Sequence, residues 1–207
     1  MTGLKKLLMW KAASGGGGGQ TITVNWNNFA PPFSTELYKA YGTDTEIEDV
    51  ETGVVRQTWV NSTSGGYARS FRLKENYPVV QTDHIYYISY MFNAQIDGLL
   101  FSSEWAGGVI PTGMPSVADT WVRFSAVENG KKNGYGVAYY LNYRGGGGMT
   151  IGTSVLAKSP LYVDLTAMFG AGNEPTLAEF ERQCALNNID LTASHPQDNG
   201  TERTWKI

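Results

Sequence analysis

The feature that most constrains this chain is a series of short, strand-like stretches with no helical stretch between them. Gly, Pro and Asn separate these stretches, and such residues favour tight turns. Strands that follow one another without helices are typical of an antiparallel sandwich, not of a parallel α/β sheet. The predicted strands are Thr21–Trp26, Val54–Val60, Ala68–Leu73, Asp83–Phe92, Trp121–Val127, Gly136–Tyr143 and Met149–Leu156.

Two of these strands differ in the burial that their patterns predict. Thr21–Trp26 alternates polar and apolar residues, as a half-buried strand does. Asp83–Phe92 is β-branched and aromatic on both faces, which predicts a central strand covered on both sides. Residues 43–51 are unusually acidic, and we expect them to form an exposed connection. The sequence therefore predicts one all-β domain, an antiparallel β-sandwich within residues 20–190.

Composition agrees with this fold class and excludes some partners. Charged residues make up 17% of the chain, aromatic residues 13%, and there are 25 glycines. This balance suits strands joined by turns and is unlike a disordered tail. The net charge of −3 provides no basic footprint for nucleic acid. No stretch approaches the ~18 apolar residues that cross a bilayer, and Lys11 ends the first apolar run too early for a signal peptide.

Residues 1–19 form a separate unit in this prediction, an arm followed by a hinge. Leu4, Leu7 and Leu8 fall on one face of a short helix, and a run of glycines, Gly15–Gly19, follows it. A helix of this length is marginal alone in water and binds a membrane surface weakly. We therefore expect the arm to dock on a partner protein through Leu4, Leu7, Leu8 and Trp10.

The segment Asp164–Glu181 predicts two helical pieces near the C-terminus. Asp164 can cap a short turn that ends at Gly170, in a left-handed conformation that glycine adopts at low cost. Thr176 and Glu179 match a capping box. The box begins a helix that should extend to about residue 187. Its apolar stripe consists of Leu177, Phe180 and Cys184. We expect this stripe to pack against the edge of the sandwich and to bury the lone cysteine. Residues 191–207 are expected to form a C-terminal tail that begins irregularly.

As a string, residues 164–181 (DLTAMFGAGNEPTLAEFE) resemble the DLTxMFGxGNEPTxxEF signature of structural proteins from tailed bacteriophages. In those proteins the signature often closes a jelly roll in a tail or fibre appendage. The resemblance implies a non-enzymatic virion protein, displayed on the tail or capsid surface as a fibre, decoration or appendage. It also implies a homo-oligomer, preferably a trimer, that is made in the host cytoplasm without a signal peptide and joined to other virion proteins by its arm.

Motifs for catalysis, metals and cofactors are not found in the sequence, so we predict none of these sites. His84 should make a structural hydrogen bond at the start of the central strand, and His195 lies in the polar tail; neither has a partner at metal-ligand spacing. Gly152–Leu156 lacks the second glycine of a serine hydrolase elbow, and the glycine-rich stretches lack the features of a P-loop. No calcium-loop motif is present. A glycosidase carboxylate pair drawn from scattered acidic residues stays open as an alternative.

Aromatic side chains are the remaining candidates for a binding site, because the C–H faces of sugars stack on Trp and Tyr. The chain has six Trp and twelve Tyr, and most should lie in the core, including Trp26, Trp121, Tyr87 and Tyr90. Four others lie near loops or glycine-rich turns and are our candidates for host-glycan binding: Trp59, Trp105, Tyr135 and Tyr143. An extended aromatic strand, then Trp121–Ser125, then a late strand that leads into Asp164 resemble the order of carbohydrate-binding-module jelly rolls. This resemblance implies that the antiparallel β-sandwich is jelly-roll-like. The alternative function is therefore a carbohydrate-binding module or the recognition part of a cell-wall-degrading system.

Overall fold

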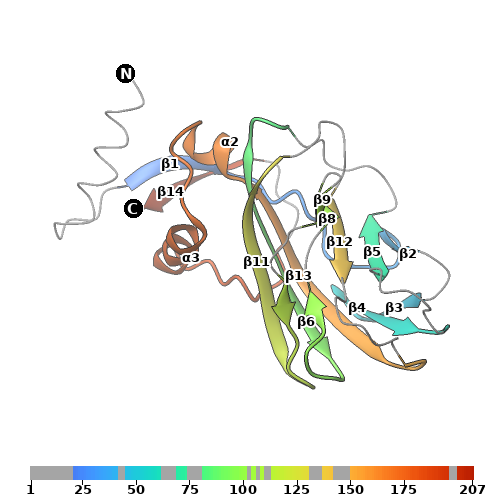
Figure 1. Cartoon of the computed structure of the whole chain (residues 1–207). Helices are drawn as coiled ribbons and strands as arrows, with labels where there is room; N and C mark the ends of the chain where they lie inside the picture. The colour runs from blue at the N-terminus through green and yellow to red at the C-terminus, as the bar shows by residue number, and fades with distance from the viewer. Residues whose placement is uncertain are drawn as a thin grey trace.

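The computed structural model describes residues 21–41, 45–61, 69–73, 81–101, 104–105, 108–109, 113–130, 137–141, 150–195 and 200–207. The predicted arm and glycine hinge lie outside these residues, as do the side chains of Leu4, Leu7, Leu8 and Trp10. In the described part the fold is the all-β, jelly-roll-like sandwich that the sequence predicts. Two five-stranded antiparallel sheets form its layers, and the helices lie to one side (Figure 1). No described helix has both the length and the apolar character that a membrane crossing requires.

The larger strands belong to the first sheet, whose order is β11-β6-β13-β4-β3. Their bounds are β3 Thr45–Glu51, β4 Val54–Trp59, β6 Ile85–Ala94, β11 Trp121–Asn129 and β13 Ser154–Asp164. The second sheet has the order β2-β5-β12-β8-β9. Its strands are β2 Tyr38–Tyr41, β5 Arg69–Leu73, β8 Glu104–Trp105, β9 Gly108–Val109 and β12 Val137–Leu141.

Two strand pairs and two helices complete the described elements. The short strands β7 (Leu100–Phe101) and β10 (Met114–Pro115) pair with each other. Near the chain ends, β1 (Thr21–Trp26) pairs with β14 (Thr201–Lys206) along its whole length. The helices are α2 (Leu165–Phe169) and α3 (Leu177–Leu186).

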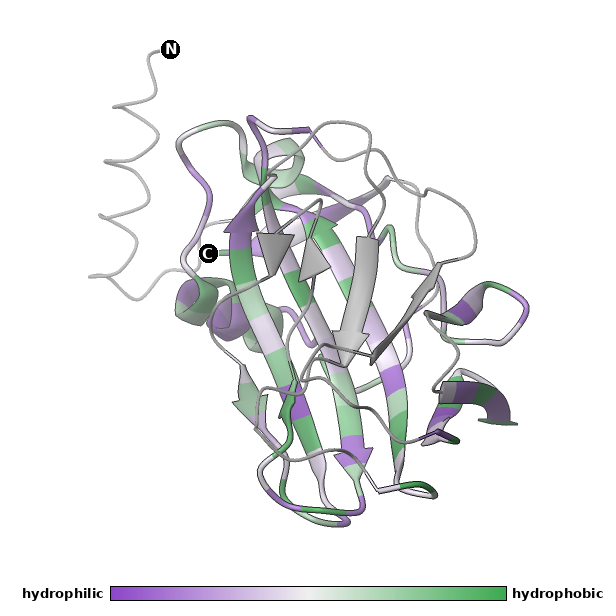
Figure 2. Ribbon diagram, turned by 45° about the vertical axis from the view of Figure 1, so that its right-hand side comes forward, coloured by the Kyte–Doolittle hydropathy of each residue, from purple (hydrophilic) through white to green (hydrophobic). Residues whose placement is uncertain are grey.

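Strand β6 is central in the first sheet, between β11 and β13, as its sequence predicts. Successive side chains point to opposite faces of a strand, so β6 supplies two different cores. Tyr86 and Tyr90 belong to the main core between the sheets, whereas Tyr87 belongs to a second core on the outer face. The two cores explain why this stretch is apolar on both faces. Figure 2 shows hydrophobic residues along the long strands of the sandwich.

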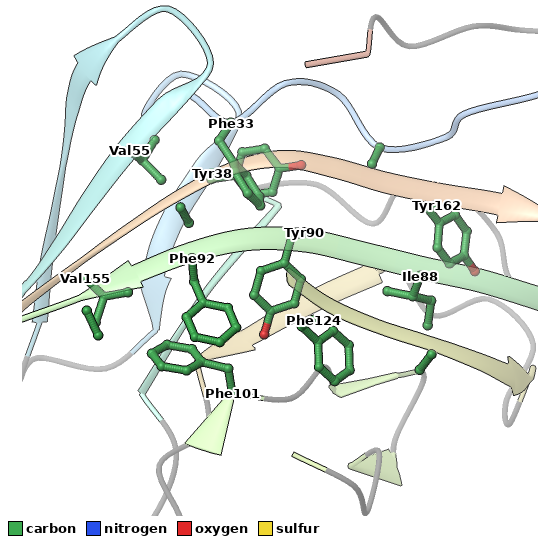
Figure 3. Close-up of a cluster of buried hydrophobic side chains, with 14 of the residues drawn as sticks. Phe33, Tyr38, Val55, Ile88, Tyr90, Phe92, Phe101, Phe124, Val155 and Tyr162 are labelled. Carbon is green, nitrogen blue, oxygen red and sulfur yellow. The ribbon is translucent and has the colours of Figure 1, made fainter. Parts of the chain in front are cut away.

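The main core is rich in aromatic rings from both sheets and from the loops between them (Figure 3). Phe92 on β6 stacks on Phe101, with ring centroids 3.8 Å apart. Tyr90 lies against Phe124 of β11, with centroids 5.1 Å apart. Offset or tilted ring pairs of this kind add to the stabilisation that comes from burial alone.

The second core covers the outer face of the first sheet at one end. It joins Tyr87 of β6 and Val163 of β13 to α2, α3 and the β1–β14 pair. The prediction that the helices pack against the edge of the sandwich is therefore wrong in this detail, because they cover a face. In Figure 1 the helices and this strand pair lie beside the upper part of the first sheet.

The predicted C-terminal tail is also corrected in part. Residues 190–195 contain no helix or strand, but Thr201–Lys206 form β14. Trp205 is buried in the second core, where its Nε1 donates a hydrogen bond to Oε1 of Gln183, 2.8 Å away. The buried ring of Trp205 thus anchors β14, whose other side chains are mostly polar or charged, to the second core.

The acidic stretch is an edge strand, not the exposed connection that we expected. Residues of β3 pair with β4, and most of their side chains are exposed. Charged side chains are common on edge strands because they discourage pairing with another chain. Glu48 also forms an ion pair with Arg56 of β4, with 2.7 Å between Oε1 and Nη1.

The predicted Asp164 cap and the capping box are confirmed, whereas Gly170 ends the first helix in a conformation other than the predicted one. Asp164 accepts a hydrogen bond from Ala167 N at 2.8 Å, and Gly170 ends α2 at a positive φ of 85°. Its ψ of 146° lies in a region that is nearly restricted to glycine, outside the left-handed helical region. Thr176 and Glu179 form the reciprocal capping box of α3.

Candidate functional site

The structure describes the side chain of one of the four aromatic residues that we predicted to bind a glycan. Trp59 is only 2% exposed and packs in the main core, so its assignment as an exposed binding residue is corrected. It is the third inward-facing position of β4, after Val55 and Gln57, which explains its burial. Trp105 lies opposite Val137 in the register of β8 and β12. Its side chain, together with Tyr135 and Tyr143, lies outside the described residues.

Trp121 is the partly exposed tryptophan of the described chain, although we expected it in the core. The other tryptophans with described side chains, Trp26, Trp59 and Trp205, are each exposed by 2% or less. Alternation along β11 gives the reason: Trp121 shares its face with Arg123, whereas Phe124 faces the main core. The polar partner two residues away was the signal in the sequence that this ring lies on the outer face.

A row of side chains crosses the outer face of the first sheet at Trp121. The register places one residue of each strand in the row, beginning at Trp121 on the edge strand β11 and ending at Glu48 on the opposite edge. We call this set the outer-face row: Trp121, Asn93, Leu156, Arg56 and Glu48. With strands ~4.8 Å apart, the row is roughly 19 Å long. None of its members is fully buried.

Lys158 lies in the next row and reaches across the sheet to Trp121. It is opposite Met91 of β6, which is in turn opposite Arg123 of β11. Its Nζ nevertheless lies over the Trp121 ring, 4.4 Å from the centroid. The lysine stem must therefore cross β6 to bring the ammonium group onto β11. A cation at this distance from an indole is within the range of a favourable cation–π contact.

Ion pairs hold the two arginines beside this contact. Arg56 pairs with Glu48, and Arg123 pairs with Glu181 of α3 at 3.0 Å. Glu181 also accepts a hydrogen bond from the Tyr87 hydroxyl at 3.3 Å. Burial raises the pKa of Tyr87 well above its usual range, so this hydroxyl stays a neutral donor. Lys158 has no carboxylate partner among the described residues, and the structure shows its ammonium over the Trp121 ring.

The histidines take structural positions. His84 Nδ1 lies 2.6 Å from Asp164 Oδ2, so the predicted hydrogen bond at the start of β6 is confirmed. The other oxygen of Asp164 caps α2. Burial is the main cause that raises the pKa of the neighbouring Tyr86 to about 12. His195 Nε2 lies 2.7 Å from the carbonyl oxygen of Asp190. In the described part of the chain, no group of three His, Cys, Asp or Glu side chains is arranged to hold a metal ion.

A cleft of about 460 Å³ borders the free edge of β11. Phe124 and Val127 of β11 contribute to it, with Met114 and Leu177 on its walls. Thr176, which also lines it, already uses its hydroxyl in the capping box. The cleft therefore offers mainly apolar contact, whereas the outer-face row combines an aromatic ring with several hydrogen-bonding groups. The outer-face row is the stronger candidate site.

Comparison with known proteins gives similarity of structure only. No protein-family model and no curated protein sequence matches the chain. The N-terminal cellulose-binding domain of β-1,4-glucanase C from Cellulomonas fimi is 13% identical, with a TM-score of 0.45 over 64% of this chain and 95% of that one.

Xylan-binding and laminarinase-derived domains are also similar. The CBM22-1 xylan-binding domain of Xyn10C from Paenibacillus barcinonensis is 11% identical, with a TM-score of 0.43 over 70% of this chain and 95% of that one. The C-terminal CBM6 of LamC from Zobellia galactanivorans is 17% identical, with a TM-score of 0.33 over 67% of this chain and 100% of that one. These structural neighbours are carbohydrate-binding modules, but at such identities and TM-scores they assign no residue or ligand to this chain.

Proposed function

We propose that this chain is a non-catalytic carbohydrate-binding domain whose glycan lies along the outer-face row, with a sugar ring on Trp121. The observation that carries the proposal is the exposure of Trp121 beside hydrogen-bonding side chains. The other tryptophans whose side chains the structure describes, Trp26, Trp59 and Trp205, are buried. Trp is enriched at interfaces because it combines a large apolar ring with a polar N–H group.

A pyranose ring likewise combines apolar and polar surfaces. Its axial C–H groups form an apolar face that can stack on the indole of Trp121, while its hydroxyls need donors and acceptors. Asn93 supplies an amide with both, one strand away from Trp121. Arg56 supplies further donors at the far end of the row. The sheet holds these groups in fixed positions, which lowers the entropic cost of binding an extended chain.

A binding role also agrees with the carboxylate in the row. Glu48 is paired with Arg56 and lies at the opposite edge from Trp121. Glycoside hydrolysis needs two carboxyl groups roughly 5–9.5 Å apart on either side of the scissile bond. The described outer-face row contains a single carboxylate, which supports recognition in preference to cleavage.

The test is glycan binding by the full chain and by two matched variants. A glycan array identifies ligands, and isothermal titration then measures the affinity of the best one. Trp121→Ala should abolish binding without unfolding the protein. Met114→Ala serves as the control, because this exposed side chain lines the cleft beside β11 and not the outer-face row. Binding that survives Trp121→Ala but is lost in Met114→Ala would move the site to the cleft.

We infer a second, compatible role as a structural protein on the surface of a tailed bacteriophage. Its support is the signature-like segment 164–181, whose residues Met168, Phe169 and Phe180 are buried in the second core. The burial of these side chains supports a structural part for the segment in the fold. In this role residues 1–14 dock on another virion protein through Leu4, Leu7, Leu8 and Trp10, and the domain is displayed as a homotrimer.

Mass spectrometry of purified phage particles tests the virion role. The protein should be found among virion components, and deletion of residues 1–14 should remove it from particles. Light scattering of the purified chain would give the mass of a trimer. Absence of the full-length protein from the particles would reject the role, and retention of the truncated protein would reject the arm as the anchor.

A further inference from the structure

We propose that the glycan of the outer-face row is acidic, and that Lys158 recognises the carboxylate of a uronic acid residue stacked on Trp121. This inference rests on the proposed function. It goes further by naming the chemical class of the ligand and the residue that selects it. The observation behind it is the ammonium of Lys158 over the Trp121 ring.

The position of Lys158 makes a neutral sugar a poor match for this ring. Its Nζ lies 4.4 Å from the ring centroid, in the space that a stacked sugar would occupy. A neutral sugar that stacks on this face must push the ammonium aside and offers it only hydroxyl groups in return. A uronic acid displaces the same ammonium and then pairs with it through its carboxylate. Charge-assisted hydrogen bonds of this kind are stronger than those between neutral groups.

Lys158 differs from the two arginines on this face, Arg56 and Arg123, because it is not in an ion pair with a described residue. Arg56 is paired with Glu48, and Arg123 is paired with Glu181. Lys158 is half-buried and has no carboxylate partner among the described residues. Its stem crosses β6 above Met91, which is only 7% exposed, so the head group is confined to the neighbourhood of Trp121. A confined, unpaired cation beside a stacking ring complements an anionic group on a stacked ligand.

Arg123 adds to the positive character of the site. It lies two residues from Trp121 on the same face of β11, and on the other side of Met91 from Lys158. Its guanidinium has five donor hydrogens, and the contact with Glu181 involves its Nη2. A carboxylate held by Lys158 would thus lie near two cations, of which Lys158 has no carboxylate partner among the described residues.

The experiment compares uronic acid polysaccharides with their carboxyl-reduced forms, in which each carboxylate becomes a primary alcohol. Polygalacturonate, alginate, hyaluronan and glucuronoxylan serve as probes, with cellulose and xylan oligosaccharides as neutral probes. The full chain should bind at least one acidic probe roughly tenfold more tightly than its reduced form, as expected for one charged hydrogen bond. The preference should weaken as the NaCl concentration is raised.

Three variants assign the preference to Lys158. Lys158→Met keeps much of the stem and removes the charge, so binding to the acidic probe should fall most of the way to the level of the reduced probe. Lys158→Arg should keep most of the preference. Lys39→Gln is the matched control, since Lys39 is an exposed lysine on β2 of the other sheet. Thermal unfolding of each variant confirms that it is folded.

The outcomes separate this inference from the proposed function. Equal binding of acidic and reduced probes, lost in Trp121→Ala, would overturn the acidic ligand and leave the glycan-binding role intact. Equal losses in Lys158→Met and Lys39→Gln would show general charge attraction and overturn the role of Lys158. Failure of every acidic and neutral probe to bind would reject both proposals.

Discussion

Trp121 and Trp205 show how residues of one type take opposite roles. Trp205 is 1% exposed, stacks with Trp26 and Phe180, and hydrogen-bonds to Gln183. Trp121 lies partly exposed on the outer face, under the ammonium of Lys158. The first ring stabilises the fold, and we assign the second to ligand binding.

Alanine substitution of each ring should separate stability from binding. Trp205→Ala should lower the free energy of unfolding by about 3–5 kcal/mol, because it leaves a large cavity and an unpaired buried amide of Gln183. Trp121→Ala should change it by about 1 kcal/mol or less and still abolish glycan binding. Urea unfolding and isothermal titration measure the two effects. A large loss of stability in Trp121→Ala would contradict its role as a surface ligand.

The same residues show what the sequence could and could not predict of the site. Alternation along β11 places Trp121 with Arg123 and away from Phe124, so its exposure was predictable from period two. The burial of Trp59 was harder to predict from the sequence, because it depends on which face of β4 meets the second sheet. The contact between Lys158 and Trp121 joins β13 to β11 across β6. Such a contact follows from strand order, which a local pattern does not contain.

Cys184 leads to a prediction about pH. Burial, with a smaller contribution from Glu181, raises the pKa of its thiol to about 12. An unfolded chain releases this proton near pH 8.5, so between about pH 8.5 and 12 the folded state holds one proton more. The stability contribution of this thiol is therefore complete below pH 8.5. It declines above that value by about 1.4 kcal/mol per pH unit.

Thiol titration and denaturation test this behaviour. The native protein should not react with an aromatic disulfide reagent at pH 8, and urea-unfolded protein should react with one equivalent. Cys184→Ala should have a shallower decline of unfolding free energy between pH 8.5 and 10 than the parent chain. A fast reaction in the native state would show that the thiol is accessible.

At the scale of elements, the strongly patterned stretches were predicted well and the charged ones were not. β6 and α3 form as their apolar periodicity and caps predict. β3 and β14 were not predicted because their charged side chains resemble an exposed loop. β3 becomes a strand by pairing with the next strand, β4, whereas β14 pairs with a strand distant in sequence. For β14 the pairing partner is β1, at the other end of the described chain. The pairing that stabilises it is therefore invisible to local analysis.

The capping box of α3 can be tested by removing one oxygen. Thr176 N donates to Glu179 Oε2 at 3.0 Å, and Glu179 N donates to Thr176 Oγ1 at 3.4 Å. Thr176→Ala should lower the free energy of unfolding by about 1 kcal/mol, within the usual range of about 0.5–2 kcal/mol for lost N-caps. Thr176→Ser keeps the hydroxyl and should stay near the parent value in urea unfolding. Equal losses in both variants would show that the threonine methyl group, and not the cap, is responsible.

At the scale of the whole molecule, one sheet supports two cores. Side chains of β6 and β13 alternate between the main core and the second core: Tyr86 and Tyr162 face the former, and Tyr87 and Val163 face the latter. Unfolding of either core would therefore expose one face of the same two strands. This sharing predicts that the sandwich and its α2–α3–β14 cover unfold as one cooperative unit.

Hydrogen exchange in rising urea tests that cooperativity, because it reports the free energy of opening for each segment. Amides of β6, between two strands, and amides of β14, paired with β1 at the periphery, should exchange with the same opening free energy once global unfolding dominates. Trp205→Ala should then lower both values together, although Trp205 lies only in the second core. A drop confined to β1, β14 and α3, with β6 unchanged, would show that the cover opens independently and that the shared sheet does not couple the two cores.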